Sequence, residues 1–78
     1  MSMEKNQIAI EVLRDIALDG SLMVSERQRA IDALTIFKAS SMEALEFIRR
    51  RTDLQILKER ANLYVSRIKA GTITNLQA

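Results

Sequence analysis

Apolar residues recur at helical spacing along most of the 78-residue chain. Over residues 3–18 they form one stripe, because side chains three and four positions apart share a face of an α-helix. The stripe comprises Ala9, Val12, Leu13, Ile16 and Ala17, and it is widened by Ile8 and Ile10. The pattern predicts a first helix that ends at Asp19 and Gly20, with Gly20 in the left-handed conformation common after a helix.

A second apolar stripe predicts a helix over residues 26–38. Its members are Ala30, Ile31, Ala33, Leu34 and Phe37. Just before it, Ser25 and Gln28 have the three-residue spacing of an N-terminal capping box. Ser40 and Glu43 repeat that spacing ahead of the next apolar run. These signals place helix starts close to Ser25 and Ser40.

Residues 41–70 contain no glycine or proline, so one long helix is conceivable. The direction of the apolar stripe argues against it. The first part of the stripe comprises Ala44, Leu45, Phe47 and Ile48, and the second part comprises Leu54, Leu57, Ala61, Tyr64, Val65 and Ile68. Because an α-helix turns by about 100° per residue, the two parts would point roughly 140° apart on one straight helix. We therefore expect helices over 41–50 and 53–70, with Thr52 or Asp53 capping the second and Gly71 ending it.

The two halves of the chain resemble each other. AIEVLR at 9–14 parallels ALEFIR at 44–49 with an offset of 35 residues, and RAIDALTIF at 29–37 parallels RANLYVSRI at 60–68 with an offset of 31. A helix–loop–helix unit of this length is typical of stacked helical hairpins. Over residues 8–70 the chain resembles HEAT and armadillo repeats, although it lacks their common proline and has two units only.

The resemblance implies an all-α fold with four helices in two stacked hairpins, and a generic four-helix bundle is the alternative. Helical arrays usually need about three units to be stable. A pair of units would expose its ends, so we expect a homo-oligomer, most simply a dimer. Residues 1–71 are expected to form a single helical domain and residues 72–78 a flexible C-terminal tail.

Composition restricts the chemistry available to the chain. It contains no cysteine and no histidine, which removes thiolate metal sites, the usual general base and the commonest metal ligand. Its carboxylates are scattered over polar helix faces, and no glycine-rich phosphate loop is present. We expect no enzymatic activity, no catalytic residues, no metal and no cofactor. No apolar run is long enough to span a bilayer and MSMEKNQ lacks a signal-peptide core, so we expect a cytoplasmic protein without a membrane partner.

The connection after the first helix is unusually apolar. Leu22, Met23 and Val24 follow one another there, and exposed apolar groups rimmed by charge mark interaction surfaces. They are our candidate contacts for a protein partner, whose identity the sequence does not give. The predicted function is a small adaptor module that presents a helical surface.

The charge of the chain is uneven. The net charge is −2 over residues 1–37 and +4 over residues 38–78. The densest basic group comprises Arg49, Arg50, Arg51 and Lys58, with Arg60 beside them, and guanidinium groups suit phosphates. The alternative function is therefore a nucleic-acid-binding regulator that uses these residues, or a helix-turn-helix at about 29–51. The favoured interpretation is structural, since basic side chains also suit a helix C-terminus.

Overall fold

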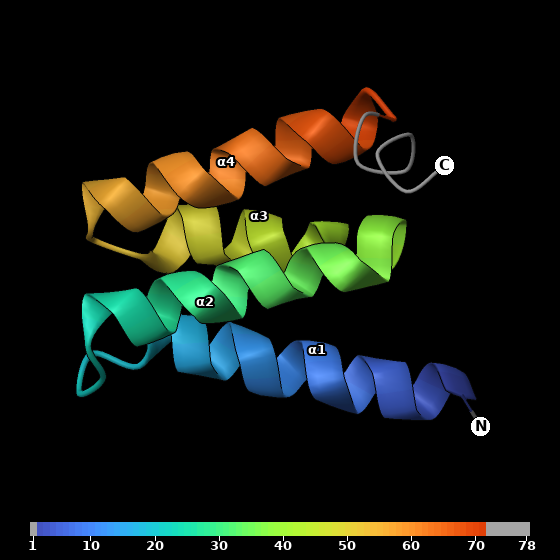
Figure 1. Cartoon of the computed structure of the whole chain (residues 1–78), viewed down its shortest axis with the longest axis horizontal. Helices are drawn as coiled ribbons and strands as arrows, with labels where there is room; N and C mark the ends of the chain where they lie inside the picture. The colour runs from blue at the N-terminus through green and yellow to red at the C-terminus, as the bar shows by residue number, and fades with distance from the viewer. Residues whose placement is uncertain (1, 72–78) are drawn as a thin grey trace.

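The computed structural model describes residues 2–71, with side chains from residue 5 onward, and every element in that range is helical (Figure 1). The predicted all-α class is confirmed. The elements are α1 (Ser2–Leu18), α2 (Val24–Leu34), the 3-10 helix η1 (Thr35–Ser41), α3 (Met42–Arg51) and α4 (Gln55–Lys69). The tail predicted over 72–78 lies outside the described residues.

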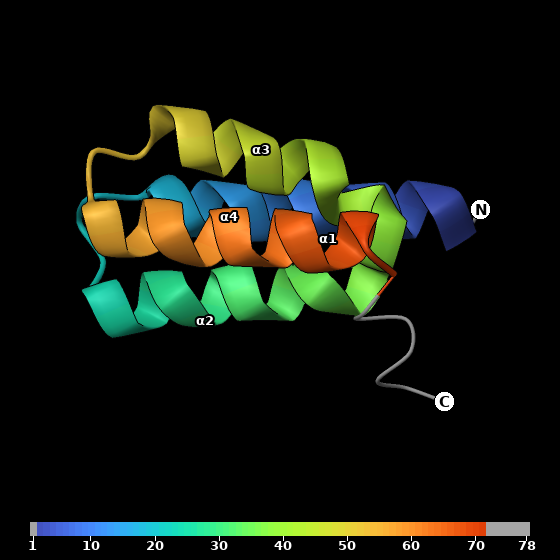
Figure 2. The same cartoon turned by 90° about the horizontal axis from the view of Figure 1, so that it is seen from above.

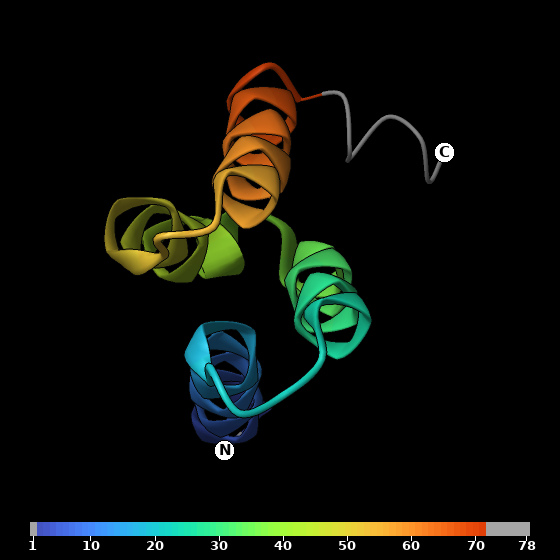
Figure 3. The same ribbon diagram turned by 90° about the vertical axis from the view of Figure 1, so that its left-hand side faces the viewer.

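The helices pair in sequence order. α1 packs antiparallel to α2, and α3 packs antiparallel to α4. The two hairpins then meet helix to helix, with α1 beside α3 and α2 beside α4, each pair running in the same direction (Figure 2). Viewed end-on, α1 and α4 occupy opposite corners (Figure 3). The core between them comprises Ile10, Ala17, Ala30, Ile31, Leu34, Ala44, Leu45, Ile48, Leu57, Ala61 and Val65.

The predicted face of the first helix is partly wrong. Ile8 and Val12 are 61% and 50% exposed, whereas Ile10, placed at the edge of the stripe, is only 3% exposed. The reason is that α1 has two neighbours, α2 and α3, and both lie on the side of Ile10 and Ala17. The remaining side of α1 is left apolar and uncovered within the described chain.

The helix predicted over 26–38 is not continuous, because its last residues belong to the link between the two hairpins. α2 ends at Leu34, and the chain tightens into η1. Lys38 has a φ of 52° and a ψ of −130°, a backbone conformation that costs a non-glycine residue free energy. The Ser41 hydroxyl donates a hydrogen bond of 2.8 Å to the Lys38 carbonyl. This reversal directs α3 back alongside α1.

The predicted break in the second half is present. α3 ends at Arg51 and α4 begins at Gln55. Thr52 is buried in the link, where its Oγ1 accepts the Leu54 N–H at 3.2 Å and its own N–H donates to the Ile48 carbonyl at 2.9 Å. The threonine therefore closes α3 and shapes the approach to α4.

The two glycines behave differently. Gly71 follows α4 with a φ of 77°, as predicted. Gly20 does not adopt a positive φ, so that part of the prediction is wrong. The turn is instead made by Asp19, whose Oδ1 accepts the Ser21 N–H at 2.9 Å and the Ser21 hydroxyl at 2.6 Å.

Candidate functional site

The predicted partner contacts lie together where α1 passes into α2. Leu22 is half-buried, Met23 is 68% exposed and Val24 is 41% exposed. We call these three residues the tip. The connection lies at one end of the first hairpin (Figure 1), and the side chains of Met23 and Val24 are exposed there.

The backbone of the tip is fixed by hydrogen bonds. Glu26 Oε1 accepts the Met23 N–H at 3.0 Å, and the Arg27 N–H donates to the Met23 carbonyl at 3.1 Å. The capping box predicted from Ser25 is therefore wrong by two positions, because α2 begins at Val24. The apolar side chains stand on a rigid support, which reduces the entropy that a partner would have to remove on binding.

Arg27 joins α1 to α2 and was not singled out from the sequence. Its side chain is buried, 6% exposed overall, and Nε donates a 2.8 Å hydrogen bond to the Ala17 carbonyl. That carbonyl belongs to the last turn of α1, where no later helical N–H is available. The positive charge of Arg27 also interacts favourably with the partial negative charge of the helix C-terminus. A basic residue one turn into a second helix was the only sequence signal.

The four residues of the predicted basic group do not form one surface. Arg49 and Lys58 line a hollow of about 270 Å³ between α3 and α4, and Arg49 Nε is buried without a hydrogen-bond partner. Arg50 lines a different hollow, between α3 and α1. Arg51 lies over the Phe47 ring, 4.9 Å from its centroid. Successive arginines therefore face different neighbours.

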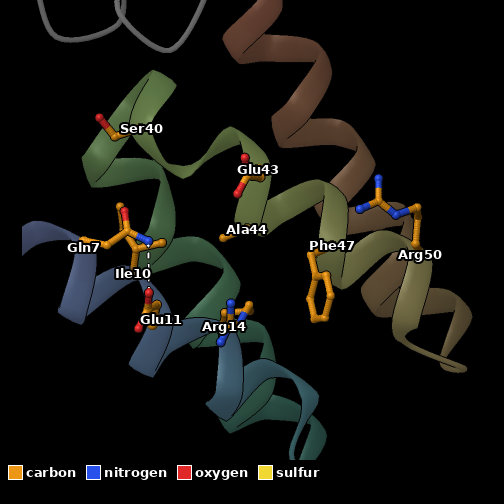
Figure 4. Close-up of a pocket in the computed structure, with 9 residues that line it drawn as sticks. All are labelled: Gln7, Ile10, Glu11, Arg14, Ser40, Glu43, Ala44, Phe47 and Arg50. Atoms are coloured by element: carbon orange, nitrogen blue, oxygen red, sulfur yellow. Dashed lines mark hydrogen bonds between the residues drawn. The ribbon is translucent and has the colours of Figure 1, made fainter.

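The hollow between α1 and α3 has a volume of about 310 Å³ and carries both signs of charge (Figure 4). Its lining comprises Gln7, Ile10, Glu11, Arg14, Ser40, Glu43, Ala44, Phe47 and Arg50. Gln7 Nε2 donates to Glu11 Oε2 at 3.2 Å, and the Arg14 guanidinium lies 5.3 Å from the Phe47 ring centroid. Two carboxylates offset the two arginines, so the hollow does not attract phosphate as a basic groove would.

The arrangement of α2 and α3 also fails to favour a helix-turn-helix. The two helices run antiparallel (Figure 1), whereas the DNA-binding motif crosses its helices at about 90–120°. The first turn of α3 carries Glu43, which is exposed and would repel phosphates.

A polar cluster joins the two hairpins. Asp32 of α2 accepts hydrogen bonds from Arg60 Nε at 2.6 Å, from Arg60 Nη2 at 3.0 Å and from the Tyr64 hydroxyl at 2.6 Å. Burial raises the pKa of Asp32, but the hydrogen bonds from Arg60 and Tyr64 outweigh it, so the pKa lies below its usual value. The pKa of Tyr64 is raised mainly by burial, and its hydrogen bond to Asp32 raises this pKa further. The cluster sets the register of α2 against α4.

We expect Asp32→Asn to lower the free energy of unfolding at pH 7, because it removes the ion pair with Arg60. The loss should be only about 1 kcal/mol, since this ion pair is partly exposed and screened by water. A lowered folded-state pKa stabilises the fold above the unfolded value of about 3.9, and this contribution is lost as the pH falls through the folded pKa. Urea unfolding should show a smaller difference at pH 3 than at pH 7. Asp15→Asn, at an exposed ion pair with its neighbour Arg14, is the control. A difference as large at pH 3 as at pH 7 would show that the charge of Asp32 is not its source.

No family model, curated protein or solved structure matches the chain. Over residues 2–71, none of the helices has the length and apolar content needed to cross a bilayer. Among residues 5–71, whose side chains are described, no three potential metal-ligating groups lie together. The geometry described above is therefore the basis for the proposals that follow.

Proposed function

We propose that this protein is a small non-enzymatic adaptor that binds another protein through a preformed helical surface. The observation that carries this proposal is the tip, where Met23 and Val24 are exposed on a backbone held by Glu26 and Arg27. Asp19 and Glu26 are exposed beside these apolar side chains. An apolar contact with an acidic rim suits a partner with a hydrophobic recess bordered by basic residues.

We also propose that the fold is a HEAT-like pair of hairpins. In an up-and-down bundle with short loops, the first helix lies beside the last. Here α1 lies beside α2 and α3, and α4 is at the opposite corner (Figure 3). The repeat of 35 residues that relates residues 9–14 to 44–49 supports the same arrangement. Such units present one continuous surface to a partner.

The test of the adaptor role is the double variant Met23→Ser, Val24→Ser. We expect it to keep the wild-type unfolding midpoint, because exposed side chains contribute within about 0.5 kcal/mol, and to lose its partner. The matched control is Ile56→Ser, Leu63→Ser, which removes two exposed apolar side chains from α4.

The measurement is crosslinking in the native host, followed by mass spectrometry and binding of the purified partner. A partner retained by the α4 variant and lost by the tip variant supports the proposal, and the same partners captured by both would contradict it.

A nucleic-acid regulator would instead bind DNA or RNA at low salt and release it steeply as salt rises, because phosphate contacts release counterions.

A further inference from the structure

The outer face of α1 is apolar and uncovered. Ile8 and Val12 are four residues apart, share this face, and are 61% and 50% exposed. Ile10 and Arg14, which line the hollow toward α3, each lie roughly 160° around the helix from Val12. We call the surface that carries Ile8, Val12 and the half-buried Ile16 the outer face. It points away from α3.

The internal repeat shows what kind of surface the outer face is. With the offset of 35 residues, Ile8 is equivalent to Glu43 and Val12 is equivalent to Phe47. In α3, Glu43 and Phe47 lie on the side of the helix that faces α1. The outer face of α1 is thus the counterpart of a face that is turned toward a neighbouring helix inside the chain. Among the described residues nothing covers Ile8 and Val12, whereas Ile16 is half-buried and packs partly against the core.

Two opposite charges mark the ends of the outer face. Lys5 and Asp19 are both exposed, and each is seven residues from Val12. They lie within roughly 40° of each other around the helix and about 21 Å apart along it. Hydrogen bonds from the Ser21 hydroxyl and amide lower the pKa of Asp19, so this end remains negative at neutral pH. The face therefore runs from positive through apolar to negative, and the exposed carboxylate of Asp15, which pairs with Arg14, lies at its edge.

We propose that a second copy of this chain covers the outer face, with the two α1 helices antiparallel about a two-fold axis at Val12. In this dimer Val12 meets Val12 of the second copy, Ile8 meets Ile16, and Lys5 pairs with Asp19. The equal spacing of both charges from Val12 makes the face complementary to itself, which is what a two-fold interface requires. The dimer adds a self-contact to the proposed function and uses none of the three residues of the tip. It shares only Asp19 with the acidic rim, so the Val12→Cys test, which leaves Asp19 unchanged, lets the two proposals fail separately.

The position of the axis is tested with Val12→Cys, which introduces the only cysteine in the chain. At the axis the two Cβ atoms can come within the roughly 4 Å that a disulfide needs. Oxidised glutathione accepts two electrons and two protons from the thiols and leaves as two reduced molecules. We expect the linked dimer to form at least about tenfold faster than for Ile56→Cys, a control of similar exposure on α4. Equal rates for the two variants would overturn the proposal.

The charge pairing is tested by sedimentation equilibrium over a dilution series. Lys5→Asp places like charges together at both ends of the interface, and we expect the dimer Kd to rise about tenfold. Adding Asp19→Asn removes the repulsion and keeps a side-chain oxygen that can accept the hydrogen bonds from Ser21, so it should lower the Kd at least about threefold from that of Lys5→Asp. A wild type that stays monomeric at the highest concentration, or a double variant as weak as Lys5→Asp, would overturn the proposal. Unfolding midpoints are measured in parallel, and the wild-type Kd should itself rise with salt.

Discussion

Leu45→Ala should lower the free energy of unfolding by about 3 kcal/mol, the largest loss we expect from a single substitution. Leu45 is 0% exposed and belongs to the central core. The substitution removes three carbon atoms and leaves a cavity, because the surrounding helices are held by their loops and cannot collapse fully into it. Small domains are stable by only about 5–15 kcal/mol, so a substantial part of the total is lost.

Leu63→Ala is the matched control, since it makes the same change at a side chain that is 45% exposed on α4. We expect it to cost less than about 0.5–1 kcal/mol. Urea unfolding, followed by circular dichroism, measures both losses as shifts of the midpoint at a constant slope. Equal losses at the two positions would mean that Leu45 is not packed as the structure describes.

Arg27→Met should lower the free energy of unfolding by about 2 kcal/mol. Methionine retains much of the apolar stem of arginine, so the loss comes from the hydrogen bond to the Ala17 carbonyl and from the charge. Without Nε that buried carbonyl has no donor, and α1 loses the positive charge at its C-terminus.

The control for this prediction is Arg29→Met, because Arg29 is exposed on the same helix. It should change the stability by no more than about 0.5 kcal/mol. Hydrogen exchange supplies a second measurement, since amides of residues 19–23 should exchange faster in the Arg27 variant alone. Unchanged exchange there would contradict the role of Arg27 in closing the first hairpin.

Sequence periodicity predicts where the helices lie along the chain better than it predicts which helices pack against one another. The break after Arg51 follows from the change in stripe direction, and it is present because a straight helix could not bury both stripes. The face of α1 was misplaced, because a periodic pattern cannot show that a helix packs on two partners. The reversal at Lys38 had no sequence signature, since neither glycine nor proline occupies it.

The candidate site shows the same limit. An apolar tip at residues 22–24 could be predicted from composition, whereas the role of Arg27 depends on a distance across the hairpin. Arg49, Arg50 and Arg51 looked like a single group in the sequence, but consecutive helical residues lie about 100° apart and meet different neighbours. The Asp32 cluster depends on the register of α2 against α4, which no single helix pattern encodes.

The hollow between α3 and α4 has a consequence for how large an assembly can become. Open-ended filaments need an attachment surface at each end of every copy. At the α3–α4 end, Arg49, Lys58 and Glu59 line a polar hollow, and a further hairpin would have to strip water from these charges at high cost. We therefore expect growth to terminate on this side, which would keep the chain from polymerising through it.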